Sequence, residues 1–277
     1  MSSVAINNET VSRKRIGAFE KRVHEVDFLR GVLIILVLLD HILNNFFIHS
    51  KTWYEITGVE FWNNVYQVTR WYWYSIPRQE IRQICLTLFC LISGISCAFS
   101  KNNWKRAGLM IVVFAVLQVA GNLLNSWHIL GDTNTIIDFN VIGVLAFSTL
   151  FYCFVEKWGW KGLTASMLAW LLFSSYGMDI IRTIPGSLEA RVPSLIEPTF
   201  DVGDWMPLVP YITFFFIGAI ISLFFYQDRK PRFKRHEWER PFCFVGRHTI
   251  WIYLGHQVVF IPIFLGITAI VRVCYGA

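Results

Sequence analysis

The stretch VDFLRGVLIILVLLDH, residues 26–41, decides the fold of this chain. Its middle is a run of apolar residues, while charged residues and a histidine stand near its two ends. A helix needs about 20 mostly apolar residues to cross the hydrocarbon core of a bilayer, and this stretch reaches that length together with the residues that follow it. We therefore predict a transmembrane helix over Val26–Ile48.

Further apolar segments of the same kind follow along the 277 residues. Hydrophobic residues make up 55% of the chain and charged residues only 16%, whereas soluble domains are about 25% charged. These values exclude a soluble enzyme and a disordered chain. We predict an all-α, polytopic integral membrane protein, a bundle of about seven transmembrane helices. The further predicted spans are Ile81–Phe99, Ala107–Leu124, Phe139–Val155, Gly162–Tyr176, Val209–Tyr226 and Gly246–Val271. Pro262 predicts a kink in the last span, or its division into two helices.

Basic residues are distributed unevenly between the segments that connect these spans. Because Lys and Arg are retained on the cytoplasmic side of a membrane, the richer set of segments is assigned to the cytoplasm. We predict a cytoplasmic N-terminus and a C-terminus outside. This topology explains the net charge of +6, and we therefore predict no nucleic-acid partner. The cytoplasmic set contains Arg13, Lys14, Arg15, Lys21, Arg22, Lys101, Lys105, Arg106, Lys157, Lys161, Arg229, Lys230, Arg232, Lys234, Arg235 and Arg240; the opposite set contains Lys51, Arg70, Arg78, Arg182 and Arg191.

Charged groups inside a membrane span are costly and usually mark a functional path. Arg30 and His41 lie eleven residues apart in the first span. Eleven residues turn a helix by about 1100°, so both side chains lie on one face, with a rise of about 16 Å between them. Asp40 points about 100° away from His41 and is not its natural partner.

This spacing suits a long ligand with phosphates at one end. Arginine binds phosphate through a planar fork of donors, and histidine acts as a base or nucleophile near neutral pH. An acyl-CoA carries phosphates and, at the end of its pantetheine arm, a thioester, so Arg30 and His41 could hold its two ends. The alternative is that Arg30 snorkels to the interface and His41 bonds a neighbouring helix.

The last span supplies a second set of polar residues. Arg247 and His256 are nine residues apart, so in a regular helix they face opposite sides and cannot line one groove. His256, with Gln257 or with Tyr253 one turn below, is the better candidate for the interior face. We predict that His41 and His256 lie at similar depth, with one reacting and one orienting; a hydrogen-bonded core histidine is the alternative for His256.

The predicted outer loop 49–80 contains the aromatic run Trp71-Tyr72-Trp73-Tyr74. Such a run is typical of an interfacial aromatic belt, and it could also form a platform on which sugar rings stack. Arg70, Trp71 and Arg82 are the candidate acceptor-binding residues here. The six cysteines form no C-x-x-C pair, so we interpret them as small buried apolar residues and predict no metal.

Four motifs occur in order along the chain: EVDFLRG at 25–31 followed by His41, LISGIS at 91–96, DWMPLVP at 204–210, and GRH at 246–248 with YLGHQ at 253–257. Together they resemble the transmembrane acyltransferase superfamily, in particular the catalytic domain of heparan-α-glucosaminide N-acetyltransferase and its bacterial relatives. The resemblance implies an acetyl-CoA-dependent enzyme that transfers an acetyl group from the cytoplasm to an acceptor outside, often a sugar amine or hydroxyl. In the wider family an arginine and a histidine with ten residues between them are functional, and Arg30 and His41 match that pattern.

On this basis we expect a cytoplasmic basic segment over 1–24 and a transmembrane acyltransferase domain over 25–277. His41 and His256 are the expected catalytic residues, and Asn44, Tyr253 and Gln257 are expected near the acceptor and the developing oxyanion. The expected acetyl-CoA-binding residues are Arg30, Arg247, Asp27, Lys230, Arg232 and Lys234.

Two other functions use the same features. A transporter or proton-coupled carrier could also employ buried Arg, Asp and His, although inverted repeats would be expected, and a non-catalytic scaffold is a third possibility.

The expected partners are the lipid bilayer, acetyl-CoA and an extracytoplasmic glycan-like acceptor, with a homodimer possible. No Asn-x-Ser/Thr sequon falls in a predicted outer loop, which favours a bacterial inner (plasma) membrane.

Overall fold

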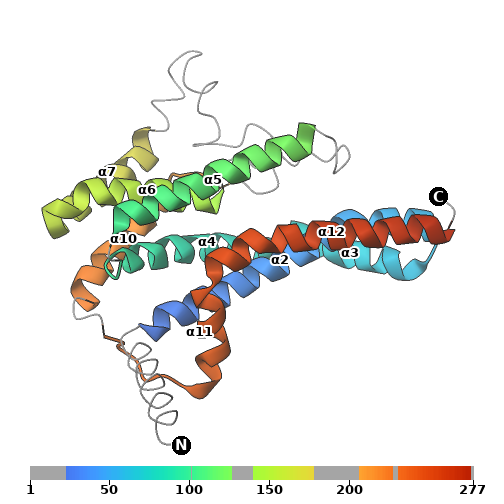
Figure 1. The fold of residues 1–277 in the computed structure, drawn as a ribbon, viewed down its shortest axis with the longest axis horizontal. Coiled ribbons are helices and arrows are strands. Elements are labelled where there is room, and N and C mark those ends of the chain that lie inside the picture. Colours follow the sequence, from blue (N-terminus) through green and yellow to red (C-terminus); the bar gives the residue numbers. More distant parts are fainter. Residues whose placement is uncertain (1–22, 101, 127–139, 178–205, 227–229, 276–277) are drawn as a thin grey trace, which may run out of the picture. The chain divides into compact units, whose positions relative to one another are not determined.

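The computed structural model describes residues 23–100, 102–126, 140–177, 206–226 and 230–275 (Figure 1). Within these ranges the regular structure is helical and no strand occurs, which confirms the all-α prediction. Most of the predicted cytoplasmic segment 1–24 and of the outer loops 125–138 and 177–208 lies outside the described residues.

Five described segments are long and apolar enough to cross a membrane. They are α2 (His24–Thr57), α4 (Ile76–Cys97), most of α5 (Asn103–Ser126), the stretch Val141–Tyr176, and α12 (Thr249–Tyr275). The polytopic prediction is thereby confirmed.

The stretch Val141–Tyr176 contains two of the predicted spans. The 3-10 turn η1 (Glu156–Trp158) and Gly159, at φ 59°, separate α6 (Val141–Val155) from α7 (Gly159–Leu172). A π-helical turn, η2 (Phe173–Gly177), follows α7. The remaining predicted span corresponds to a shorter apolar helix, α10 (Tyr211–Phe225).

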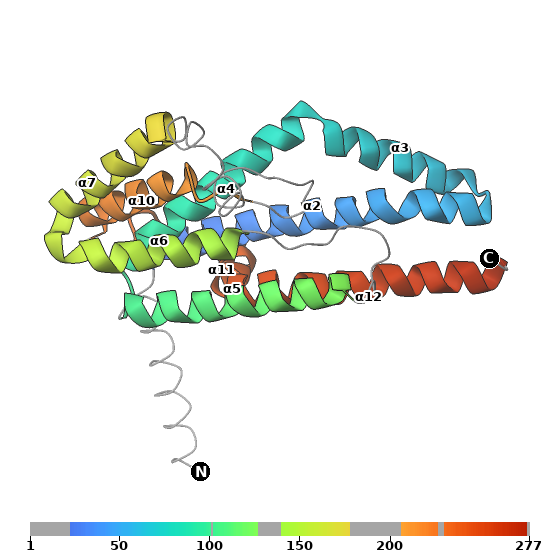
Figure 2. The same ribbon diagram turned by 90° about the horizontal axis from the view of Figure 1, so that it is seen from above.

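The segment 49–80, predicted as an outer loop, is helical for most of its length. Helix α2 continues to Thr57, α3 covers Glu60–Tyr74, and α4 begins at Ile76. Gly58 ends α2 in the left-handed region, at φ 66°, and its N–H bonds the Tyr54 carbonyl, so the chain can reverse and α3 runs back along α2 (Figure 2). The loop prediction was wrong because α3, with 15 residues, is shorter than a membrane span and was not recognised as a helix.

The predicted last span also begins at a different residue. A 3-10 turn, η3 (Glu237–Glu239), leads into α11 (Arg240–Arg247), and α12 starts after His248. Helix α12 passes Pro262 without interruption, so the alternative of two helices divided at Pro262 is wrong. The chain instead changes helix at His248, which places Arg247 and His256 on different helices.

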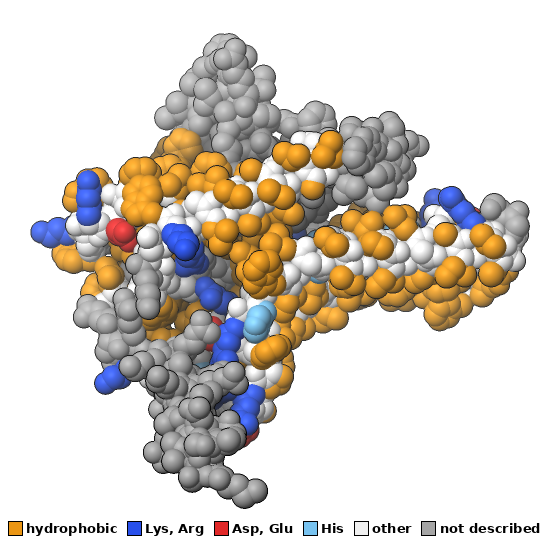
Figure 3. Space-filling model, viewed as in Figure 1, with side chains coloured by type: hydrophobic (Ala, Val, Ile, Leu, Met, Phe, Trp, Pro, Cys, Tyr) orange, Lys and Arg blue, Asp and Glu red, His pale blue; other side chains and the backbone are white. Residues whose placement is uncertain are grey.

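The chain forms two compact units, which are described separately. The first consists of residues 1–85 and 231–277, and the second of residues 86–230. In the first unit α2 and α12 lie side by side, as both views show (Figures 1 and 2). Apolar side chains cover α12 along most of its length (Figure 3), and Trp251, Val258 and Val273 are 72%, 72% and 83% exposed, as expected for a helix that faces lipid.

Two glycines bring α11 against the start of α2. A Cβ on Gly31 would lie 2.0 Å from the Phe242 carbonyl oxygen, and one on Gly246 would lie 1.7 Å from the Asp27 carbonyl oxygen. No real Cβ tolerates such distances, so the two backbones meet only because these positions lack a side chain. Two of the four sequence motifs therefore owe their glycines to one helix contact.

The second unit has an apolar core in which α4 packs against α10. A Cβ on Gly94 would lie 1.9 Å from the Phe215 carbonyl oxygen, and one on Gly218 would lie 1.9 Å from that of Leu91. The core of this unit includes Cys90, Val144, Leu163, Ile212, Phe215 and Phe216. The LISGIS motif is thus a packing site in this unit.

Candidate active site

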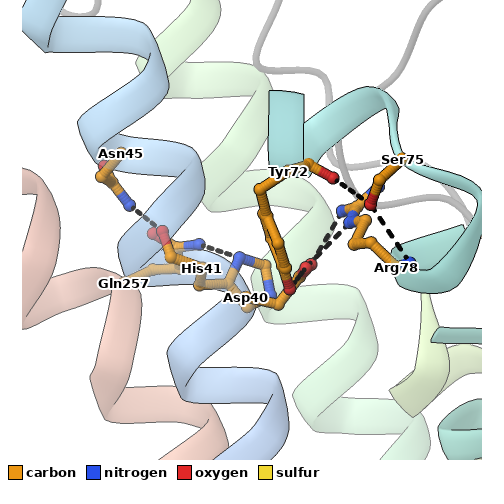
Figure 4. A network of polar contacts seen from close by, with 7 residues as sticks. All are labelled: Asp40, His41, Asn45, Tyr72, Ser75, Arg78 and Gln257. Atoms are coloured by element: carbon orange, nitrogen blue, oxygen red, sulfur yellow. Dashed lines mark hydrogen bonds and ion pairs between the residues drawn. The ribbon is translucent and has the colours of Figure 1, made fainter. Parts of the chain in front are cut away.

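His41, in the middle of α2, faces α12. The side-chain nitrogen of Gln257 lies 3.0 Å from His41 Nδ1 (Figure 4). The rings of His41 and His256 are 4.6 Å apart between centroids and tilted by 52°. The structure therefore brings together the two histidines and the glutamine that the sequence singled out, although they stand more than 200 positions apart in the chain.

Neighbouring residues hold these side chains in place. His256 is buried, and its Nδ1 bonds the carbonyl oxygen of Tyr253 one turn below. The Tyr253 ring lies 5.4 Å from the His256 ring. On α2, the Asn45 amide donates to the His41 carbonyl oxygen at 2.8 Å, while Asn44 is half-buried beside it. The site thus contains the His41 ring and the Asn45 amide, about one turn apart on α2. It also contains the side chains of Tyr253, His256 and Gln257, which lie within about one turn on α12.

Asp40 belongs to a separate polar network on another side of α2 (Figure 4). Arg78, in the first turn of α4, donates from Nε and Nη2 to its two carboxylate oxygens, both at 2.8 Å. The Tyr72 hydroxyl donates to the same carboxylate at 2.9 Å, and the Arg78 guanidinium lies 3.7 Å above the Trp73 ring. Arg78, counted among the basic residues of the predicted outer segments, is therefore paired with a carboxylate inside the protein.

The sequence contained a signal for this pair. A carboxylate within a membrane span needs a compensating charge, and the arginine that opens the next span was available to supply it. The sequence did not show that α3 runs back along α2, which places Arg78 beside Asp40.

The aromatic residues of α3 divide between its two faces. Tyr66 and Trp73 stack on Phe47 of α2, with centroids 5.7 and 6.1 Å away, and Trp62 packs edge-on against Trp53 at 4.7 Å. Trp71 is 73% exposed, and its neighbour Arg70 is exposed as well. Arg82 is half-buried on α4. Trp71 and Arg70 thus lie on the exposed face of α3, while Trp62, Tyr66 and Trp73 pack against α2.

At the N-terminal end of α2, Asp27 pairs with Arg247. The Arg247 Nε lies 3.2 Å from an Asp27 carboxylate oxygen, and the two side chains are 14% and 11% exposed. Arg30, one turn further along α2, is half-buried. The break at His248 makes this arrangement possible, because it lets Arg247 face α2 independently of the register of α12.

Glu25 joins the segment before α11 to the start of α2. One of its oxygens accepts hydrogen bonds from the backbone N–H groups of Arg232 and Phe233, and the other lies 3.3 Å from His24. The side chains of Arg232 and Lys234 are exposed. Lys230 is exposed too, but it belongs to the second unit.

Two further residues near this junction were not identified from the sequence. His24 also lies 3.7 Å from Glu239, and the thiol of Cys243 is directed at the His24 carbonyl oxygen. Burial raises the pKa of the Cys243 thiol, which keeps it protonated and unreactive. Among the described residues, no group of three or more His, Cys, Asp or Glu side chains is placed to bind a metal.

Comparison with known proteins identifies the family of this chain. A family model described as "Heparan-alpha-glucosaminide N-acetyltransferase, catalytic" matches residues 22–258. The matched region runs from the start of α2 past His256 and Gln257, and so includes every polar contact described above. No curated protein and no solved structure matches the chain.

Proposed function

The chain belongs to the heparan-alpha-glucosaminide N-acetyltransferase catalytic family, and from that premise we propose that it transfers an acetyl group from cytoplasmic acetyl-CoA to an amine or hydroxyl at the outer side of a membrane. The acceptor belongs to the sugar class. A bacterial inner membrane is the proposed location. A transmembrane acetyltransferase is what the family implies; the donor, the acceptor and the residues that act are the substance of the proposal.

One observation carries the proposal. His41 of α2 meets His256 and Gln257 of α12 within the apolar part of both helices, and Arg30 lies eleven residues nearer the inner end of α2. The rise between Arg30 and His41 is about 16 Å, of the same order as the pantetheine arm of acetyl-CoA. A thioester that enters from the inner end can therefore reach His41 while its phosphates stay beside Arg30.

The inner end of the first unit fits a phosphate ligand. Arg30 supplies a guanidinium, and the exposed side chains of Arg232 and Lys234 add positive charge. Asp27 repels phosphate, so its part in binding is to hold Arg247, which it contacts at 3.2 Å. The pair also fastens α11 to α2, which keeps the basic segment before α11 near Arg30.

The middle of the first unit fits acyl transfer. A thioester is already activated, so the site has to position it, remove a proton from the acceptor and stabilise the oxyanion. The imidazoles of His41 and His256 serve these steps, with Asn44, Tyr253 and Gln257 as supporting donors. On the outer side, Arg70, Trp71 and Arg82 are the proposed contacts to the acceptor.

The experiment uses purified protein in liposomes, with labelled acetyl-CoA on one side and a hexosamine on the other. His41→Ala is expected to lower kcat about 100-fold or more, because acid–base catalysis and oxyanion stabilisation each contribute a factor of that order. His49→Gln, two turns further along α2, is the matched control and retains activity. If His41→Ala transfers acetyl groups as fast as the wild type, the assignment of His41 is wrong.

A further inference from the structure

The two imidazoles of the candidate site have hydrogen-bond partners of opposite kinds. His256 Nδ1 bonds the carbonyl oxygen of Tyr253, and a carbonyl oxygen can only accept. His256 therefore carries a proton on Nδ1. Since a neutral imidazole has a single N–H, the lone pair of neutral His256 is on Nε2.

His41 is in the reverse situation. Its Nδ1 lies 3.0 Å from the side-chain nitrogen of Gln257, and an amide NH₂ group can only donate. His41 Nδ1 is thus the acceptor, and a neutral His41 carries its proton on Nε2. Asp40 cannot reverse this assignment, because its carboxylate is occupied by Arg78 and Tyr72.

Gln257 decides the tautomer of His41. Its carboxamide can present either a donor or an acceptor, depending on a half-turn of the terminal group. The orientation in the structure presents the donor. The opposite orientation would place a proton on His41 Nδ1 and leave Nε2 as a base or nucleophile.

We propose that the two histidines are opposite tautomers with separate roles: His256 Nε2 is the base, His41 Nε2–H donates to the thioester carbonyl, and Gln257 is the positioning residue that fixes the His41 tautomer. This inference rests on the acetyl transfer proposed above. The ring centroids lie 4.6 Å apart, so the two imidazoles are close enough to act on the same acyl group.

The resulting step is a direct transfer. The acceptor amine or hydroxyl attacks the thioester carbonyl carbon, so a C–N or C–O bond forms and the carbonyl oxygen becomes an oxyanion bonded by His41 Nε2–H. His256 Nε2 takes the proton that the acceptor loses. The C–S bond then breaks, and the CoA thiolate receives that proton from His256 and leaves as a thiol. No acetyl group is attached to His41, because its Nε2 holds a proton instead of a lone pair.

The first test reads the tautomers and does not depend on activity. Protein labelled with ¹⁵N-histidine in liposomes is examined by solid-state NMR, and the His41 and His256 signals are assigned by their loss in His41→Ala and His256→Ala. The expected result is a proton on Nε2 in His41 and on Nδ1 in His256. A His41 proton on Nδ1 overturns the inference.

The second test changes the partner of His41 Nδ1. Gln257→Glu offers only an acceptor when ionised, which forces a proton onto His41 Nδ1, whereas Gln257→Leu offers neither donor nor acceptor. We expect kcat to fall in the order wild type, Gln257→Leu, Gln257→Glu, with the last about 100-fold slower, the usual cost of losing one oxyanion donor. The KM for acetyl-CoA stays near the wild-type value, because the phosphate end is untouched.

The outcomes separate the inference from the proposed function. Gln257→Glu as fast as the wild type, or an acetyl group trapped on His41 by acid quenching, shows that His41 is the base or nucleophile and overturns the inference. If Gln257→Glu does not fold, the inference is tested by the tautomers in the wild-type NMR spectrum and by the kcat of Gln257→Leu. Absence of acetyl transfer by the wild type contradicts the proposed function, while the tautomers remain measurable.

Discussion

The two compact units use buried polar groups in different ways. In the first unit, charged and amide side chains bond from one helix to another: Asp40 to Arg78, Asp27 to Arg247, and His41 to Gln257. In the second, the bonds between helices end on a hydroxyl or start from an amide, as from Arg106 to Ser93 and from Asn103 to Glu156. Several of its buried hydroxyls bond the carbonyl groups of their own helix, as Ser96 does to Ile92, Thr149 to Leu145 and Ser222 to Ala219.

The two kinds of bond constrain the fold to different degrees. A hydroxyl bonded within its own helix satisfies a polar group and fixes nothing about a neighbour. A charge paired between helices fixes the position of both, and costs much more when one partner is removed. We therefore expect substitutions at the paired side chains of the first unit to change activity, and substitutions in the apolar core of the second unit to change stability.

The largest expected effect is on the Asp40–Arg78 pair. Arg78→Met leaves the Asp40 carboxylate uncompensated, and loss of one partner of a buried pair costs about 3–5 kcal/mol. Unfolding in mixed detergent measures this free energy. The matched change in the second unit, Thr149→Val, removes one intrahelical bond and costs about 1 kcal/mol.

The double variant Asp40→Leu, Arg78→Met supplies the control for this prediction. It removes both charges, and so should be more stable than Arg78→Met alone. If the changes in free energy of unfolding caused by Asp40→Leu and Arg78→Met add up to that of the double variant, the two side chains do not form a pair in the folded protein. The two units would then not differ at this position.

The next effect concerns the glycine contacts, in which the two units are alike. Gly246→Ala in the first unit and Gly94→Ala in the second each force a Cβ against a carbonyl oxygen, and should lower the free energy of unfolding by about 1–3 kcal/mol. Gly266→Ala and Gly108→Ala are the controls, because a Cβ there meets nothing within 4 Å. These helical substitutions should be neutral or stabilising by about 0.5–1 kcal/mol.

Activity then distinguishes the two glycine variants. Gly246→Ala separates α11 from α2 and displaces Arg247 from Asp27, so the remaining folded protein should bind acetyl-CoA more weakly. Gly94→Ala should leave the KM of the folded fraction unchanged. An equal rise of KM in both variants would contradict the assignment of the phosphate site to the first unit.

Much of the fold was predictable because a membrane span is a matter of length and composition. The first predicted span was found as α2, and the similar depth predicted for His41 and His256 is consistent with their rings lying 4.6 Å apart. Helix α3 was not recognised, because a 15-residue helix with aromatic residues on both faces lacks the apolar length of a span. The boundary at His248 was missed because Gly246, two residues before it, was interpreted as the start of the last span.

The side-chain pairs of the site could not be predicted, because they depend on helix α3 and on the helix boundary at His248. Arg78 reaches Asp40 because α3 reverses the chain, and Arg247 reaches Asp27 because α11 ends before α12 begins. Neither partner is implied by spacing within one helix. The bond between Gln257 and His41 also required knowing that α2 and α12 are neighbours, a contact between helices near opposite ends of the chain.

A further prediction compares the N-terminal end of α2 with its middle. Arg30→Ala removes a proposed charged contact to phosphate, worth about 1.5–3 kcal/mol, so the KM for acetyl-CoA should rise about tenfold or more with kcat nearly unchanged. Arg272→Ala, an exposed arginine in the last turn of α12, is the control. A fall in kcat at constant KM would move Arg30 from binding to the reacting centre.

The smallest effect compares the two faces of α3. Trp71 is 73% exposed, so Trp71→Ala should change the free energy of unfolding by less than about 0.5 kcal/mol. Trp73→Ala should destabilise the protein, because Trp73 stacks on Phe47 and lies under Arg78. Measuring both in mixed detergent establishes which face packs.

Acceptor kinetics of Trp71→Ala then choose between the two interpretations of the aromatic run. If the outward face of α3 is a platform for sugar rings, the KM for the acceptor should rise several-fold, since stacking on one aromatic side chain contributes about 1 kcal/mol, while the KM for acetyl-CoA stays constant. If the face is an interfacial belt, neither KM changes, and the variant differs from the wild type only in its partition into lipid. The same residue thus tests whether the outer part of the first unit recognises a substrate or anchors the protein in the bilayer.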